Sequence, residues 1–371
     1  MMLVKDIQKI LESWAPPELA LERDAVGLQV GSPDQRVRKI LVALDVTKSV
    51  FEEARRTKTD LVISHHPLFF QPLRSLRDDD RVGELLLKLA RHQISLYAAH
   101  TNLDFARSGV SSVLAERFGL TNLAVLRGQT EVYKKIAVYV PAGHVENVRG
   151  AMAHAGGGHI GNYDTCSFQT EGTGTFRGTA DAVPFIGTVG VLERVREIRL
   201  EMLVPKWKVR SVVAAMRSAH PYEEVAYDVY NLANESHDCG AGIIGELQRP
   251  TTLKAFLGRV GRALHVPTLR FTGDLRQKVR CVAVCGGSGS DLLRCAVHQG
   301  GDTFVTSDVK YHAFEEAEGI IALVDAGHFE TEVPVVRKLV DYLKNELAIR
   351  GRDVRVMASK QSRNPVKYYL S

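Results

Sequence analysis

Short apolar runs alternate with amphipathic stretches through the first part of the chain. Three runs have the length of a buried strand, and a stretch with helical spacing follows each of the first two. The strands are expected at 40–44, 61–63 and 94–98, and the helices at 50–56 and 81–91. This alternation predicts a doubly wound α/β domain.

The pattern changes at about residue 130. From there to residue 240, the order strand, helix, strand occurs twice, with a glycine-rich stretch at 172–175. This order is typical of a ferredoxin-like domain. We therefore expect an N-terminal α/β lobe (1–129), an inserted α+β domain (130–240) and a C-terminal α/β lobe (241–371).

The α/β alternation resumes near residue 245. Helices are expected at 253–264 and 333–347, and buried strands at 279–284, 304–306 and 320–324. Thr331 is placed to cap the long last helix. A glycine-rich turn follows residues 279–284, but it lacks the lysine of a P-loop and the spacing of a dinucleotide motif. It is therefore a weak signal for anion binding.

Composition narrows the possible partners. The 371 residues are 45% hydrophobic and 25% charged, which is typical of a globular protein. A net charge of +5 does not indicate a nucleic-acid surface. No apolar window approaches the length of a membrane span. Residues 1–11 do not resemble a signal peptide, and the five cysteines fit reduced thiols, so we expect a cytoplasmic protein.

Potential metal ligands follow four of the predicted strands, two in each lobe. In chain order they are His65 and His66, then Asp104 with His100 close by, then Asp308 with His312, and finally His328 with Glu332. The carboxyl ends of strands are the usual ligand sites of open α/β sheets. Imidazoles and carboxylates bind zinc, manganese or iron, and a carboxylate can bridge two ions. The adjacent histidines could serve two different ions, or diverge around one irregular turn. No serine or cysteine nucleophile motif accompanies them.

Three of these motifs carry a resemblance to a known family. They are His65-His66-Pro67, His100-Thr-Asn-Leu-Asp104 and Gly327-His328-Phe-Glu-Thr-Glu332. With Asp24–Gly31 and Cys285–Ser290, they make the outer two thirds of the chain resemble the Nif-three-like dinuclear metal family, often called GTP cyclohydrolase 1 type 2 homologues. The segment 130–240 resembles the PII/CutA-like domain of longer bacterial members. Ala25 departs from the asparagine expected in the family, at a position that is not a ligand.

The resemblance implies a two-lobed α/β core that binds two divalent metal ions: zinc, iron or manganese. The ligands it implies are His65, His66, Asp104, His328 and Glu332, with the two carboxylates as candidate bridges. It gives His100, Tyr311 and His312 supporting or substrate-facing roles, and either histidine could carry a proton. It also implies a homo-oligomer, a hexamer.

We therefore expect a metal-dependent hydrolase that acts on a small nucleotide-like or phosphorylated substrate, because paired ions can activate water. The alternative is a non-catalytic regulatory or adaptor protein that binds metal and uses the PII-like domain as a sensor. Nucleic-acid binding is a third possibility, and the weak charge excess gives it little support. We expect no membrane partner.

Overall fold

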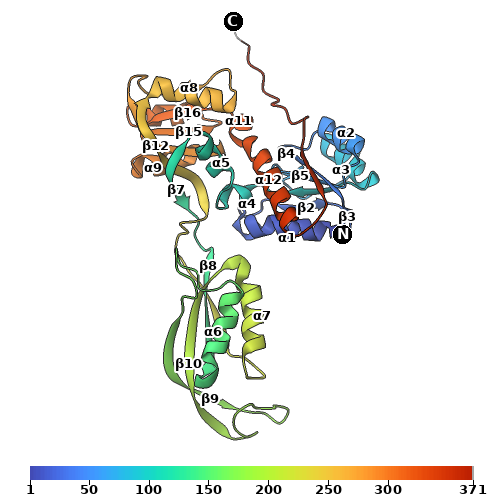
Figure 1. Ribbon diagram of the computed structural model, residues 1–371, viewed down its shortest axis with the longest axis vertical. Coiled ribbons are helices and arrows are strands. Elements are labelled where there is room, and N and C mark those ends of the chain that lie inside the picture. The colour runs from blue at the N-terminus through green and yellow to red at the C-terminus, as the bar shows by residue number, and fades with distance from the viewer. Residues whose placement is uncertain (370–371) are drawn as a thin grey trace. The chain divides into compact units, whose positions relative to one another are not determined.

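The chain folds into two compact units, and the computed structural model describes residues 1–369. The first unit combines Met1–Gln129 with the chain from His237 onward, and the second is Thr130–Ser236 (Figure 1). Each unit contains both helices and strands, so the mixed α/β class expected from the sequence is confirmed. None of the helices in residues 1–369 combines the length and apolar character that a membrane span needs.

One sheet of the first unit has five strands in the order β17-β4-β5-β6-β2. They are β2 (Gly27–Val30), β4 (Lys39–Ala43), β5 (Leu61–Ser64), β6 (Ser95–Ala98) and β17 (Arg355–Ala358). All are parallel to their neighbours except β2, which pairs antiparallel with β6 at the edge. Ser64 pairs with Ala98, so the residues that follow β5 and β6 leave the sheet side by side.

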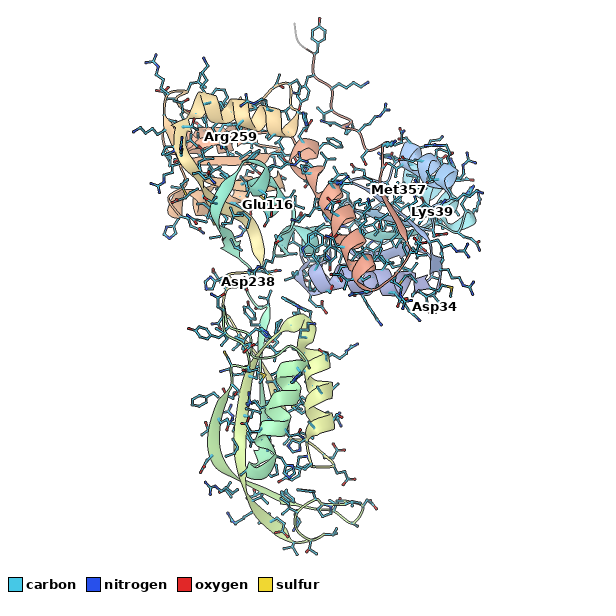
Figure 2. All side chains as sticks on the ribbon, viewed as in Figure 1. Asp34, Lys39, Glu116, Asp238, Arg259 and Met357 are labelled. Carbon is cyan, nitrogen blue, oxygen red and sulfur yellow. The ribbon has the colours of Figure 1, made fainter. Side chains whose placement is uncertain are left out.

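Four longer helices accompany this sheet: α1 (Val4–Trp14), α2 (Lys48–Thr57), α3 (Arg81–Arg91) and α12 (Pro334–Ile349). Phe51 of α2 and Leu85 of α3 pack with Leu41, Val62 and Leu96 of the strands in one core. The helix α12 contacts β4 and β17. Met357 of β17 packs against the same core, and Lys39 at the start of β4 donates to the carbonyl of Thr57 (Figure 2).

The other sheet of the first unit has six strands in the order β13-β16-β15-β14-β12-β7. They are β7 (Leu120–Gly128), β12 (Gly240–Thr252), β13 (Arg270–Phe271), β14 (Lys278–Ser288), β15 (Thr303–Ser307) and β16 (Ala322–Asp325). The strands β14, β15 and β16 are parallel, and the other three join antiparallel.

Helices pack in two separate cores against this second sheet. The helices α5 (Val110–Arg117) and α8 (Leu253–Leu264) share one core with Val282, Val284 and Val305. The helices α9 (Leu293–His298) and α10 (Tyr311–Ala317) share the other with Ala283, Phe304 and Leu323. Because neighbouring residues of a strand point to opposite faces, the two cores lie on opposite sides of the sheet. Arg259 of α8 donates to the carbonyl of Phe118 (Figure 2).

The last helical stretch begins earlier than the sequence suggests. A short helix α11 (His328–Glu332) precedes α12, so the prediction that Thr331 caps the long helix is wrong. The Thr331 hydroxyl instead donates within α11 to the carbonyl of Gly327 at 2.9 Å and accepts the Gly287 N–H at 3.0 Å. Thr331 thus ties α11 to the end of β14. Shorter elements complete the unit: β1 (Met2–Leu3), β3 (Arg36–Val37), α4 (Thr101–Phe105), η1 (Pro17–Leu19) and η4 (Ser290–Leu292).

The second unit is one antiparallel sheet with two helices. Its elements are β8 (Tyr133–Pro141), η2 (Ala142–His144), α6 (Val145–His154), β9 (Phe168–Arg177), β10 (Leu192–Pro205), η3 (Lys206–Lys208), α7 (Val209–Ala219) and β11 (Tyr227–Asn231). The strand order is β11-β8-β10-β9. Ile198, Leu200 and Met202 of β10 pack with Val148 of α6 and Val212 of α7 in the core of this unit.

Candidate metal centre

The strand β5 delivers two adjacent histidines to its carboxyl end. The N–H groups of His65 and His66 still donate to the carbonyls of Ala43 and Leu44, so the backbone stays attached to β4 beyond the strand. Pro67 has no N–H and ends this pairing. His65 is completely buried, and the ring centroids of the two histidines are 5.0 Å apart.

The next strand, β6, delivers His100 and Asp104. His100 immediately precedes α4, and Asp104 lies one helical turn further on, so both project from the same side of this short helix. The His100 ring lies 5.4 Å from that of His65 and 5.6 Å from that of His66. The Oδ1 atom of Asp104 is 3.5 Å from Nε2 of His65.

The other sheet contributes the short helix α11 after β16. His328 and Glu332 are its first and last residues, four positions apart, and His328 Nε2 lies 3.0 Å from Glu332 Oε2. Gly327 makes the turn into α11 with φ of 83°, and a Cβ atom there would lie 2.3 Å from Oε2 of Glu330. This position therefore requires glycine.

Glu332 brings the residues of α11 into contact with the histidines that follow β5. Its carboxylate is almost completely buried, and Oε2 lies 2.9 Å from Nε2 of His66, while Oε1 lies 3.9 Å from Nε2 of His65. Possible ligand atoms gather in two overlapping groups, each within 4.8 Å: His65, His66 and His100, and His66, His328 and Glu332. Either group could bind a metal ion.

Each of the four imidazoles is held through Nδ1. The acceptors are the carbonyl of Ala99 for His65, and the carboxylates of Asp45, Asp24 and Asp308 for His66, His100 and His328, at distances of 2.6 to 2.9 Å. An acceptor at Nδ1 favours the neutral tautomer with its proton there, which presents the Nε2 lone pair to a metal ion. Metal-binding histidines are oriented in this way.

Unpaired buried atoms give a test of whether a metal fits. Nε2 of His65 and Oδ1 of Asp104 are buried and have no hydrogen-bond partner among the described residues. Buried polar atoms without partners are costly, and clusters of nitrogen and carboxylate oxygen are suited to divalent ions. The residues present therefore fit a metal centre.

The pKa values of the histidines in this centre show that their surroundings favour positive charge. Burial lowers the pKa of His66, but the Asp45 and Glu332 carboxylates outweigh burial and raise it to about 10. Glu332 and Asp308 raise the pKa of His328 to about 9 against the effect of burial. Burial raises the pKa of the Asp104 carboxyl to about 6 despite the nearby His65. In the metal-free protein, protons on the imidazoles thus balance the carboxylates.

Two residues singled out in the sequence lie away from this group. Tyr311 and His312 begin α10, and both side chains are mostly exposed. The His312 Nδ1 atom pairs with Glu315 at 3.1 Å, and Tyr311 packs edge-on against His312.

Two residues of the centre were not identified from the sequence. Asp24 and Asp45 hold His100 and His66. Asp45 comes just after β4. A search for ligands at the carboxyl ends of strands, which located the other candidates, could therefore have found it too. Asp24 lies in an irregular segment before β2; it opens the Asp24–Gly31 motif that supports the resemblance, but its contact with His100 was not predicted.

Comparison with known proteins identifies the family. The model of the Duf34/NIF3 (NGG1p interacting factor 3) family matches residues 2–365. The chain belongs to the Duf34/NIF3 family. NIF3 relatives named "GTP cyclohydrolase 1 type 2 homolog" include one from Halalkalibacterium halodurans, 40% identical over 97% of both chains, and one from Bacillus subtilis, 39% identical over 98% of both.

A solved NIF3 relative has the same fold along the whole chain. The Bacillus cereus protein related to NIF3 superimposes with a TM-score of 0.86 at 40% identity, over 99% of both chains. The recognition of a Nif-three-like chain from its histidine and carboxylate motifs is therefore confirmed.

Proposed function

We propose that this NIF3 protein is a dinuclear-metal-dependent hydrolase of a small nucleotide-like or phosphorylated substrate. The observation that carries the proposal is the convergence of the Nε2 atoms of His65, His66 and His328 on the carboxylates of Asp104 and Glu332, while an acceptor holds each Nδ1. Relatives named as GTP cyclohydrolase homologues support a nucleotide-like substrate.

The ligands divide into two sets that share Glu332. His65, Asp104 and Glu332 would hold one ion, and His66, His328 and Glu332 the other, with Glu332 as the bridge. Charge supports two ions: five carboxylates, Asp24, Asp45, Asp104, Asp308 and Glu332, lie in or directly behind the centre. Two divalent cations would offset most of this negative charge. Bound there, zinc, iron or manganese would supply Lewis-acid activation of water and of an anionic substrate.

The remaining residues provide binding and proton transfer. A cavity of about 430 Å³ adjoins His66, His100 and His328, and its lining includes Phe70 and Arg81. The exposed ring of Phe70 lies 5.6 Å from that of His100, and a planar base could stack on it. Arg81 offers a cation for a phosphate. His100, held by Asp24 at Nδ1, is placed to carry a proton at Nε2. A catalytic role for His312 or Tyr311 stays a prediction.

The test is a turnover screen of metal-loaded protein against nucleotides and phosphoesters, with Glu332→Gln as the control variant. Turnover that needs both the metal and Glu332 supports the proposal. Metal binding without turnover of any of these substrates favours the alternative, a non-catalytic regulatory or adaptor protein.

We also propose that residues 130–236 form a ferredoxin-like domain of the PII/CutA-like kind. Its element order, strand-helix-strand-strand-helix-strand, and its strand order β11-β8-β10-β9 support this assignment. A homohexamer follows from the family resemblance alone. Light scattering of the purified protein tests it, and a monomer would refute it.

A further inference from the structure

The second unit carries a cavity of about 560 Å³ that is separate from the metal centre. Its lining includes Glu197 and Arg199 of β10 and Tyr139 of β8. Ile198 and Leu200 of β10 face the helical core. Because side chains alternate along a strand, Glu197 and Arg199 point to the opposite face of the sheet. The cavity therefore lies on the side of the sheet that α6 and α7 do not cover.

Glycines leave room in this face. Gly172 of β9 pairs with Glu197, and Gly174 pairs with Val195. A Cβ atom at Gly174 would lie 1.9 Å from Oε2 of Glu197, whereas one at Gly172 would meet nothing within 4 Å. Gly174 thus provides the space for the carboxylate, and Gly172 leaves open space beside it.

Aromatic rings form one side of the cavity. The ring of Tyr222 lies 6.0 Å from that of Phe176 and 6.2 Å from that of Phe185. Phe185 belongs to the loop between β9 and β10, the two strands that run on past α6 in Figure 1. The N–H of Val183 in this loop donates to Glu223 at 2.9 Å, which ties the loop to the segment after α7.

The Glu197 carboxylate is buried and has no cationic partner among the described residues. Glu197 is only 8% exposed, and its Oε1 atom accepts a hydrogen bond from the Tyr222 hydroxyl at 2.8 Å. Within residues 1–369, no nitrogen of lysine, arginine or histidine lies within 4.0 Å of this carboxylate; the neighbouring Arg199 pairs with Glu201 at 2.9 Å. A buried carboxylate is costly to keep ionised without a cationic partner. The lining as a whole contains four glutamates and two arginines.

We propose that this cavity binds a small organic cation with a planar or apolar body. Glu197 would accept hydrogen bonds from its charged nitrogen, and charge-assisted bonds of this kind are strong. The rings of Phe176, Phe185 and Tyr222 would cover the body and add cation–π attraction. Amidinium and guanidinium groups suit such a site, because they are planar and match a carboxylate with two donors. The proposal does not depend on the activity of the metal centre.

The test uses three matched probes with the full-length protein: benzamidine as the cation, benzamide as its neutral analogue and benzoate as the anion. Binding is followed by ligand-observed NMR up to about 10 mM, since molecules this small bind weakly. We expect benzamidine to bind at least tenfold more tightly than benzamide, and benzoate not to bind.

Variants locate the binding. Glu197→Gln keeps the size of the side chain and an acceptor for Tyr222, and should weaken benzamidine binding at least tenfold. Gly174→Ala should weaken it as well by crowding the carboxylate. The matched control is Glu146→Gln on α6, because Glu146 is an exposed glutamate that pairs with Arg149 at 2.7 Å and does not line the cavity; it should leave binding unchanged. Absence of benzamidine binding to the unaltered protein, equal binding of all three probes, or full binding by folded Glu197→Gln would overturn the proposal.

Discussion

Replacing Asp45 by alanine should weaken one of the two proposed metal sites and spare the other. The Asp45 carboxylate lies 2.8 Å from Nδ1 of His66, and among the described residues it forms no ion pair with His65. Without it, the His66 ring is free to rotate and its Nδ1 proton is no longer held. Only the ion bound by His66, His328 and Glu332 should then be affected.

The size of the effect follows from the exposure of Asp45. Loss of a group that orients a metal-binding histidine typically reduces metal affinity 10- to 100-fold, or about 1.4 to 2.7 kcal/mol. The Asp45 side chain is 40% exposed, so water can partly replace it as an acceptor. We therefore expect a reduction near the lower limit, roughly tenfold.

The assay is a titration of metal-free protein with zinc in competition with a chromophoric chelator. The unaltered protein should show two tight sites, and Asp45→Ala one tight and one weakened site. Asp34→Ala is the matched control, because Asp34 is an exposed aspartate whose partner is Lys5, outside the centre (Figure 2). Two unchanged sites in Asp45→Ala would refute the claim that Asp45 orients a ligand. Equal weakening of both sites would refute the division into two ligand sets.

Three further predictions concern the bridge, the protons and the inserted unit. Glu332→Gln should lose both ions while far-UV circular dichroism stays unchanged, because the amide removes the shared negative charge; retention of one ion would show that Glu332 does not bridge. Metal-free protein should lose thermal stability as the pH rises from about 6.5 through about 9 and 10, because the raised pKa values of His328 and His66 stabilise the fold only while these groups are protonated. Melting curves in chelator that stay flat over this range would contradict the assignment. Replacing residues 133–233 with a short Gly/Ser linker should leave a folded protein that still binds metal, since every proposed ligand lies in the first unit; a folded but metal-free product would refute this.

The position of a residue at a strand end could be predicted from the sequence, because buried strands are continuous apolar runs. This is why His65, His66, His100, Asp104, His328 and Glu332 could be proposed before the fold was known, and the structure brings them together. Parallel neighbours then place these strand ends at one edge of each sheet.

The direction of a side chain after a strand could not be predicted in the same way. Asp308 has a φ of 53°, and the chain turns there before α10 begins. Asp308 consequently reaches His328, whereas Tyr311 and His312 are exposed on α10. The helix α11 was missed for a similar reason. Five residues are too few to show a helical period, and Thr331 resembles an N-cap although it lies inside α11.

Anomalous diffraction can show directly whether the chain binds a pair of metal ions. Crystals of protein purified without chelator should be measured on both sides of the zinc, iron and manganese absorption edges. We predict two anomalous peaks per chain, one in contact with His65, Asp104 and Glu332, and the other in contact with His66, His328 and Glu332. A single peak, or peaks that Glu332 does not contact, would contradict the dinuclear centre.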